Sequence, residues 1–396
     1  MKILAIETSC DETAIAIIEA EGALPALNFR VLANNTLTQI EMHKQYGGVF
    51  PMLAKREHAR TLVPLLVKTL QDAKMYGKTS RHVIESPLRP EFQDILEREP
   101  ELFAQFIDVL PTVNPPEIDA IAVTQGPGLE PALWVGINFA KALSLIWKKP
   151  VIPVNHMEGH LLAPLLKKEG DATILANITF PAIGLLVSGG HTELILMRGI
   201  SQYEMIGATK DDAVGEAFDK VARILGLPYP GGPEISKLAE TGHANVYTLP
   251  RPMLHSKDYS FSFAGLKTAV LYMVKKMGTL TQEQKVDIAR EFEEACVQVL
   301  VSKTMRAAQE FGAKSVILGG GVSANKRLRK TLQEKTEETG EATLYLPDHD
   351  DHQLSTDNAL MIAIAGYFGN ASTDPSALKA RGNWKLAQTT PHTIPK

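Results

Sequence analysis

Two histidines stand four residues apart in the stretch VNHMEGH, which ends an apolar run that begins at Val151. Residues four apart lie on the same face of a helix, so the imidazoles of His156 and His160 could bind one metal ion. Two ordinary polar residues at the start of a helix would give the same pattern. The spacing therefore suggests a metal site, and the suggestion depends on a third ligand from elsewhere in the chain.

The best candidate for that ligand is Asp357, in the stretch LSTDNALMIAIAG at the head of an apolar helix. Ser355 or Thr356 beside it could cap this helix. Two histidines and one carboxylate leave coordination positions open for a substrate, as in iron(II) sites and catalytic zinc sites. The sequence therefore predicts one divalent metal ion, and both iron and zinc suit these ligands.

Glu158 lies between the two histidines and has a simpler explanation than catalysis. Asn155 is a good helix N-cap, and a glutamate three residues later fits the capping-box pattern. A metalloprotease would carry HExxH, with the glutamate directly after the first histidine as general base. The order here is HMEGH, so a protease at this site would lack its base.

Glycine-rich turns indicate a second kind of site. The pairs and triplets at Gly189, Gly190, Gly231, Gly232 and 319–321 follow apolar runs or lie in turns. Any one of them could be a simple turn, but together they provide the bare backbone that seats a nucleotide's phosphate and sugar. No GxxxxGK[ST] motif is present, so a P-loop NTPase is not expected.

Asp219 is predicted to lie on an amphipathic helix in VGEAFDKVARILG. It could be a surface charge paired with Lys220 or Arg223, or it could hydrogen-bond a ribose hydroxyl. Both interpretations stay open on the sequence alone.

The elements that would position these residues repeat along the chain. KILAIETSCDETAIAIIE predicts two strands joined by a tight turn, and residues 182–197, AIGLLVSGGHTELILM, have the same form. Coincidence between two hairpins is the alternative to two related α/β halves. SVILGGGVSANKRLRK predicts a strand, a glycine turn and a helix. Residues 282–312 predict a long helix with Cys296 in the core.

Composition limits the remaining interpretations. The chain has 396 residues, 44% of them hydrophobic, and a net charge of -4, which is globular and gives no general affinity for nucleic acid. Two cysteines and no apolar run of 18 residues predict a reducing, cytoplasmic compartment and no membrane span. Two basic clusters could form a rim for tRNA or could be solvated helix faces. These clusters are Lys55, Arg56 and Arg60, and Lys326, Arg327, Arg329 and Lys330.

Taken in order, the motifs resemble the tRNA threonylcarbamoyladenosine synthase family of the bacterial TsaD type, formerly called O-sialoglycoprotein endopeptidase. The matching stretches span nearly the whole chain: IETSCDET, GGVFPMLAKREH, GPGL, NHMEGH, LLVSGGHTEL, VGEAFDKVARILGLPYPGG, LKTAV, GGGVSAN and STDNALMIA. The resemblance implies an α/β fold of two duplicated RNase H-like lobes, as in the actin, sugar-kinase and Hsp70 superfamily, with a central ligand cleft. We expect one lobe over 1–150, with an insertion at 77–116, and the other over 151–396.

The resemblance also implies an activity. The family transfers the threonylcarbamoyl group from threonylcarbamoyl-AMP to the exocyclic amine of adenosine-37 in tRNAs that read ANN codons. By the same resemblance His156, His160 and Asp357 bind the metal, expected to be Fe²⁺ with Zn²⁺ as the alternative, and Asp11 is needed for activity. The implied adenylate-binding residues are Leu186, Val187, Ser188, Gly189, Gly190, Asp219, Gly232 and Asn325.

Three departures from the family pattern stand out. Ala264 replaces the serine of FSFSGLKTAV, Ser355 stands where the family often has cysteine, and the connection at 77–116 is unusually long. No hydroxyl at residue 264 can therefore be essential, and no thiolate ligand can come from residue 355.

The expected partners are tRNA, a non-catalytic paralogue and a small ATPase, as in bacterial relatives. Mitochondrial relatives act as homodimers. Besides the protease, the alternative functions are an ATP-dependent kinase or chaperone of the same superfamily and a scaffold without catalysis. The intact metal and adenylate motifs argue against a scaffold, and a histidine ligand pair argues against kinases, which hold Mg²⁺ by carboxylates and water.

Overall fold

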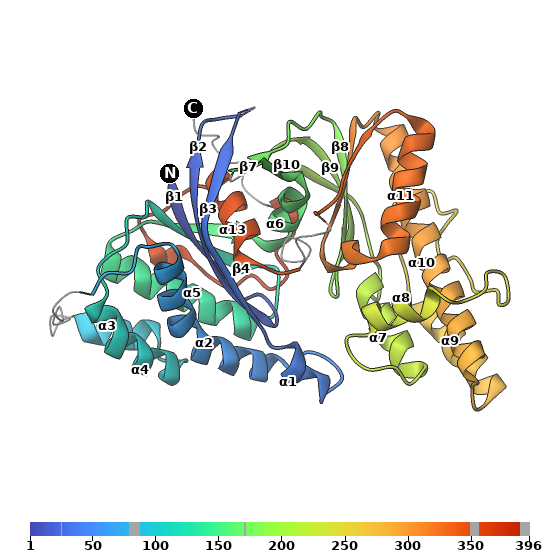
Figure 1. The fold of residues 1–396 in the computed structure, drawn as a ribbon, viewed down its shortest axis with the longest axis horizontal. Helices are drawn as coiled ribbons and strands as arrows, with labels where there is room; N and C mark the ends of the chain where they lie inside the picture. The colour runs from blue at the N-terminus through green and yellow to red at the C-terminus, as the bar shows by residue number, and fades with distance from the viewer. Residues whose placement is uncertain (25, 79–87, 170–171, 349–355, 389–396) are drawn as a thin grey trace. The chain divides into compact units, whose positions relative to one another are not determined.

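Two β-sheets organise the chain (Figure 1). The structure, a computed structural model, describes residues 1–24, 26–78, 88–169, 172–348 and 356–388. Backbone contacts divide the chain into two units, one made of 1–43, 49–177 and 357–396 and the other of 44–48 and 178–356.

This division differs from the expected boundary after residue 150. Residues 151–177 and 357–396, assigned to the second lobe from the sequence, belong to the first unit. The reason is strand pairing and helix packing: β5 (Val151–Asn155) pairs in parallel with β4 (Ala120–Gly126), and the late helix α13 (Ala359–Phe368) packs on β1 and β2.

The first unit contains a seven-stranded sheet in the order β5-β4-β1-β2-β3-β7-β6. Strands β1, β4 and β5 are parallel, and the other neighbours are antiparallel. The predicted first hairpin is confirmed as β1 and β2. The strands not yet given are β1 (Lys2–Glu7), β2 (Glu12–Glu21), β3 (Asn28–Thr38), β6 (Leu166–Glu169) and β7 (Ala172–Leu175).

Helices cover both faces of this sheet. Leu4 and Ile6 of β1 belong to a buried cluster that includes residues of α2 and α5. Helix α13 also packs on β1 and β2, but its residues are not part of that cluster. Strands that are buried on both faces read as continuous apolar runs, which explains KILAI and AIAII. The helices of this unit are α1 (Ile40–Lys44), α2 (Pro51–Asp72), α3 (Leu88–Ile95), α4 (Pro100–Val109), α5 (Glu130–Trp147) and α6 (His156–Leu162), with short 3₁₀ turns η1 (Leu110–Thr112), η2 (Ala163–Leu165), η4 (Pro375–Ala377) and η5 (Leu386–Gln388).

The insertion at 77–116 contains two helices, α3 and α4, where the sequence suggested one amphipathic piece. Phe92 and Phe106 are fully buried, and their rings lie 5.2 Å apart in the core of the first unit. The ends of the insertion meet where Asn114 N donates to Gly77 O. The described part of the insertion therefore contributes to the core of the unit.

The second unit repeats the strand order of the first. Its sheet runs β12-β11-β8-β9-β10, with β8, β11 and β12 parallel and β8-β9-β10 antiparallel, which matches β5-β4-β1-β2-β3 strand for strand. This correspondence confirms the predicted duplicated α/β fold. The strands are β8 (Ala182–Val187), β9 (Thr192–Gly199), β10 (Gln202–Ala208), β11 (Ser315–Gly319) and β12 (Thr343–Tyr345).

The predicted long helix of this unit is α10 (Gln282–Glu310). Thr281 and Gln284 form a reciprocal capping box at its start, and Cys296 is fully buried as expected. The other helices are α7 (Val214–Ile224), α8 (Gly231–Ala239), α9 (Ala264–Met277) and α11 (Lys326–Thr339), with the 3₁₀ turn η3 (Gly321–Ala324). Among the described residues, no helix combines the length and apolar character needed to cross a membrane.

Candidate metal centre and glycine-turn site

The helix α6 carries both histidines of the VNHMEGH stretch. It begins directly after β5, and the Asn155 side chain caps it by accepting a hydrogen bond from Met157 N at 2.9 Å. His156 is the first helical residue, and His160 follows one turn later on the same face. The predicted cap at Asn155 is confirmed, and Glu158 is buried within the helix.

Asp357 comes from the start of α13. The cap of α13 is neither Ser355 nor Thr356 but Asn358, whose side chain accepts from Met361 N, and Ser355 itself lies outside the described residues. Because Asn358 caps α13, the Asp357 side chain is not needed as the helix cap. Gly159 allows α6 to approach α13 closely, because a Cβ there would lie 3.0 Å from Met361 Cγ.

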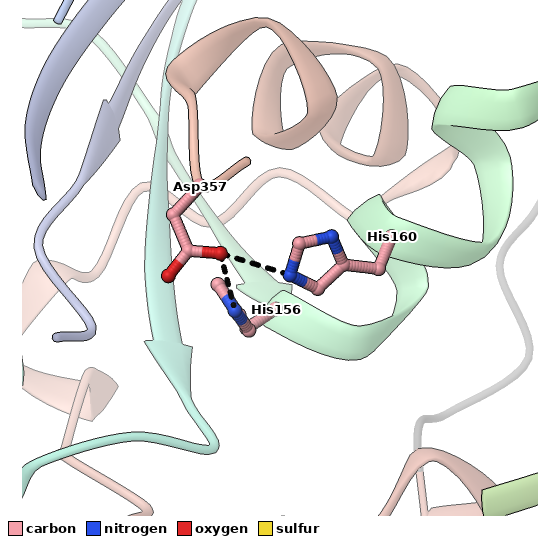
Figure 2. A group of neighbouring side chains, drawn as sticks. All are labelled: His156, His160 and Asp357. Carbon is pink, nitrogen blue, oxygen red and sulfur yellow. Dashed lines mark ion pairs between the residues drawn. The ribbon is translucent and has the colours of Figure 1, made fainter. Parts of the chain in front are cut away.

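The two histidines and Asp357 meet in one cluster (Figure 2). Asp357 Oδ1 lies 3.5 Å from His156 Nε2 and 2.9 Å from His160 Nε2, and the imidazole rings are edge to face, with their centroids 4.6 Å apart. One potential ligand atom from each residue lies within 4.8 Å of the others.

This donor set fits a divalent ion. His160 Nε2 is buried and has no partner in hydrogen-bond geometry among the described residues, although it faces Asp357. Two imidazole nitrogens and one carboxylate oxygen suit iron(II) or zinc. The Asp357 side chain retains 21% exposure, whereas the histidine side chains are almost fully buried, so the open side of the cluster lies at the carboxylate.

A second layer of side chains surrounds His156. Its Nδ1 lies 3.1 Å from Glu7 Oε2 and 3.2 Å from Ser9 Oγ. Glu7 is fully buried at the end of β1, where its two oxygens also accept from Ser9 N and from Thr124 Oγ1, both at 2.5 Å. The sequence did not predict this layer. A carboxylate directly after the buried run ILAI was the available signal.

Charges within the cluster shift its pKa values in opposite directions. Burial acts to raise the pKa of Asp357, but His156 and His160 hold it well below its usual range. Burial acts to lower the pKa of His156, but Asp357 and Glu7 raise it well above normal. These shifts show that the carboxylates favour positive charge at this point, and a bound cation would meet the same preference.

Asp11 lies on the turn between β1 and β2, beside this cluster. Burial raises the pKa of its carboxyl group, and the nearby charge of Asp357 adds to the effect. Burial also raises the pKa of the neighbouring Glu12 well above normal, with Asp11 as the next contribution. The turn thus gathers acidic groups close to Asp357, and these groups become easier to ionise when a cation is near.

His58 of α2 anchors the same turn. Its Nε2 lies 3.0 Å from the Cys10 carbonyl oxygen, and its Nδ1 lies 2.7 Å from Thr13 Oγ1. A carbonyl oxygen can only accept, so Nε2 carries the proton and Nδ1 accepts from the Thr13 hydroxyl. Burial lowers the pKa of His58 from 6.5 to about 4. The neutral ring is therefore the form that holds the turn.

This burial predicts a stability loss in acid. The unfolded chain takes up a proton on His58 below its ordinary pKa of 6.5, whereas the folded chain resists until about 4, so the folded state loses stability as pH falls between these values. We expect His58 to contribute about 3 kcal/mol to this loss by pH 4. Urea unfolding of the wild type and of His58→Gln at pH 7.5 and pH 4 measures it. Equal pH slopes for the two proteins would contradict the assignment.

The glycine turns of the second unit converge at the carboxyl end of β8. Ser188 Oγ accepts from Gly190 N and His191 N, and a Cβ on Gly215, at the start of α7, would lie 2.9 Å from Gly189 Cα. Gly320, after β11, has φ +86° and approaches the Val187 carbonyl, so only glycine fits there. Strand ends with bare backbone are where parallel sheets bind ligands.

Asp219 links this site to α8, and it does not form the expected ion pair with Lys220. Its Oδ1 accepts from Gly231 N at 2.7 Å at the start of α8, whereas Lys220 pairs with Asp212 and Glu216. A Cβ on Gly232 would meet nothing within 4 Å, so the first turn of α8 borders open space. Gly231 and Gly232 both donate their N–H groups to the Asp219 carboxylate, and Pro233 has none, so the open space beside this turn is bordered by the glycine backbone and by Asp219.

Asn325 completes the link between helices. It caps α11 by accepting from Leu328 N, and its Nδ2 donates to Ser236 Oγ and Glu293 Oε1 at 2.8 and 2.7 Å. The described structure therefore uses this side chain to position α8, α10 and α11, and its predicted contact with the adenylate stays a prediction. At the departure from the family pattern, Ala264 offers its backbone N–H to Asp211 at 3.2 Å.

The two basic clusters are largely occupied by partners within the chain. Lys55 pairs with Glu99, and Arg60 pairs with Glu57 and Glu101. In the second cluster the pairs are Lys326 with Glu240, Arg327 with Glu294 and Lys330 with Glu334, and Arg329 donates to the Ser323 and Pro347 carbonyls. Internal pairing explains both runs, which weakens their interpretation as a rim for tRNA.

Comparison with known proteins agrees with the geometry. The model of the TsaD family, described as tRNA N6-adenosine threonylcarbamoyltransferase, matches residues 30–83 and 104–364. A relative of that name from Ralstonia pickettii is 44% identical over 370 residues, covering 92% of this chain and 90% of the relative. Another from Chromobacterium violaceum is 42% identical over 392 residues and covers 98% of each chain.

Solved structures with some likeness include full-length HypF in its phosphate- and nucleotide-bound form and a ROK hexokinase from Thermus thermophilus. HypF gives a TM-score of 0.45 at 15% identity, covering 68% of this chain and 41% of HypF. The hexokinase gives 0.44 at 12% identity, covering 93% and 98%.

The duplicated α/β fold and the family match define an enzyme of the transferase class. The chain belongs to the TsaD family of tRNA N6-adenosine threonylcarbamoyltransferases.

Proposed function

We propose that this chain transfers the threonylcarbamoyl group from threonylcarbamoyl-AMP to the exocyclic amine of adenosine-37 in tRNAs that read ANN codons. The family match over most of the chain carries the proposal. The convergence of His156, His160 and Asp357 supports it, since these residues meet although they come from distant parts of the sequence.

The reaction is an acyl transfer to a weak nucleophile. The adenosine amine is a weak nucleophile because its lone pair is delocalised into the ring, so the donor carries a good leaving group. The amine nitrogen bonds to the carbamoyl carbon, the bond from that carbon to the phosphate oxygen breaks, AMP leaves, and the nitrogen gives up a proton. The protein must align the two substrates and stabilise the charge that develops on the donor oxygens.

The residues His156, His160 and Asp357 would hold one divalent ion, Fe²⁺ or Zn²⁺. Such an ion supplies Lewis-acid polarisation of a donor oxygen. The protein's own contribution is to fix the ligand geometry through α6 and α13 and to leave the cluster open at the partly exposed carboxylate of Asp357.

The donor's adenylate is proposed to bind at the glycine-turn site of the second unit. Bare backbone at Gly189, Gly190 and Gly232 borders open space, so the phosphate and ribose of the donor can approach the main chain closely there. The Asp219 carboxylate accepts from the backbone N–H groups of Gly231 and Gly232, and its further lone pairs can accept from a ribose hydroxyl. The proposed contacts come from Leu186, Val187, Ser188, Gly189, Gly190, Asp219, Gly232 and Asn325.

Asp11 is proposed as the catalytic carboxylate. Burial raises the pKa of Asp11, and a carboxylate with a raised pKa is a better proton acceptor near neutral pH. That role fits the proton that the adenosine amine releases. We also propose that the chain works with a non-catalytic paralogue and a small ATPase.

Reconstitution tests the proposed function. The purified, metal-loaded chain is incubated with unmodified tRNA that reads an ANN codon and with threonylcarbamoyl-AMP, with and without the two partner proteins, and the nucleosides are analysed by mass spectrometry. A tRNA with guanosine at position 37 is the matched control. We expect modified adenosine only in the adenosine-37 tRNA. No product in either arm would contradict the proposal.

A further inference from the structure

The buried carboxylate of Glu7 faces the metal-ligand cluster from behind His156. His156 directs its Nε2 toward Asp357 and its Nδ1 toward Glu7 Oε2, at 3.5 and 3.1 Å. An imidazole in this position can bind an ion through Nε2 only if the proton resides on Nδ1. The partner of Nδ1 therefore decides whether His156 can act as a ligand.

Two groups compete for that nitrogen. Ser9 Oγ lies 3.2 Å from Nδ1 and can either donate or accept, so by itself it would leave the tautomer undefined. An ionised Glu7 can only accept. Its carboxylate is already ordered by hydrogen bonds from Ser9 N and Thr124 Oγ1, both at 2.5 Å, and it is fully buried. The Ser9 backbone N–H holds Oε1 in place, and Oε2 is thereby directed at His156 Nδ1.

We propose that Glu7 is a positioning residue of the metal centre, which holds His156 as the Nδ1–H tautomer and thereby presents Nε2 to the ion. The inference rests on the metal site of the proposed function. Carboxylates that accept from metal-binding histidines orient the ring and increase ligand basicity, and their loss typically costs about 10–100-fold in metal affinity.

The pair Glu7→Gln and Thr124→Val separates positioning from general packing. Glutamine keeps the size of Glu7 but has one acceptor oxygen in place of two. If that oxygen accepts from Ser9 N, the amide NH₂ group faces His156 Nδ1, and if it accepts from His156, the NH₂ group faces the Ser9 N–H. Thr124→Val removes a hydroxyl that touches the same Oε2 but leaves the carboxylate. Ser9→Ala removes the competing partner of Nδ1 and keeps the Ser9 backbone N–H.

Zn²⁺ affinity is measured by chelator competition on the full chain, with thermal melting as a check on folding. We expect Glu7→Gln to lose about 10–100-fold in Zn²⁺ affinity, and Thr124→Val and Ser9→Ala to stay within about threefold of wild type. Equal affinity of Glu7→Gln and wild type would overturn the inference. A wild type that binds no Zn²⁺ would instead remove the metal site of the proposed function.

The histidine tautomer gives a readout that does not depend on the variant folding. Long-range ¹H–¹⁵N correlation spectra of the ¹⁵N-histidine-labelled wild type are recorded with Zn²⁺ and without it. The inference requires the proton on Nδ1 of His156 and a Zn²⁺-induced shift at Nε2. In the Zn²⁺-bound protein, a His156 Nδ1 without a proton, or Zn²⁺ bound through Nδ1, would contradict it.

Discussion

His156→Ala is expected to lose the metal ion and the transfer activity together. The substitution leaves two protein ligands, His160 and Asp357, where the cluster has three. It also leaves the Glu7 carboxylate buried without its histidine partner. Because a bound ion contributes several kcal/mol of charge stabilisation in the transition state, we expect kcat/KM to fall by at least about 100-fold.

Metal content after dialysis and the tRNA transfer assay measure this prediction in parallel. His58→Gln is the matched control, since His58 is another buried histidine of the first unit and its described hydrogen-bond partners are Cys10, Thr13 and Gln39. The control should retain its metal. Full activity in a metal-free His156→Ala protein would remove the metal from the proposed mechanism.

Gly232→Val is expected to abolish use of the donor without unfolding the chain. A side chain at this position meets nothing within 4 Å, and the backbone is not in the left-handed region, so the fold can accommodate valine. The same side chain would fill the open space that borders the first turn of α8. Misplacing the donor by about 1 Å is enough to cost about 100-fold in rate, so kcat/KM for threonylcarbamoyl-AMP should fall by at least that factor.

Gly265→Val is the matched control for this change. Gly265 lies in the first turn of α9 and also has open space where a Cβ would be. Both variants should melt near the wild-type temperature and bind Zn²⁺ as tightly as wild type, because the metal ligands belong to the other unit. If the two valine variants used the donor equally well, the adenylate assignment at Gly232 would be wrong.

Individual strands, turns and helices could be predicted from the sequence, because each depends on the pattern of neighbouring residues. The two hairpins, the strand before Gly319 and the long helix α10 all follow from apolar periodicity and turn residues, and the structure confirms them. The cap at Asn155 was also readable, because a helix start depends on a few neighbouring residues.

Long-range relations were much harder to predict. Helix α13 returns to the first sheet, so the expected boundary after residue 150 was misplaced. Asp219 accepts from Gly231 N in the next helix, a partner that no nearby spacing indicates. Glu7 was not singled out from the sequence, because its contact with His156 depends on how β1 lies beside β4 and β5. Spacing suggested the histidine pair, whereas the convergence with Asp357 required the tertiary fold.

The most direct test of the account is the dependence of transfer on metal occupancy. The wild-type chain is stripped with a chelator, reloaded with increasing Fe²⁺ or Zn²⁺, and assayed for modified adenosine in single-turnover reactions with its partners present. We expect the metal-free chain to bind tRNA but to transfer nothing measurable, and we expect the transfer rate to rise in proportion to the ion bound. A metal-free chain that transfers at the full rate would contradict the central claim that His156, His160 and Asp357 form a metal centre that assists the reaction.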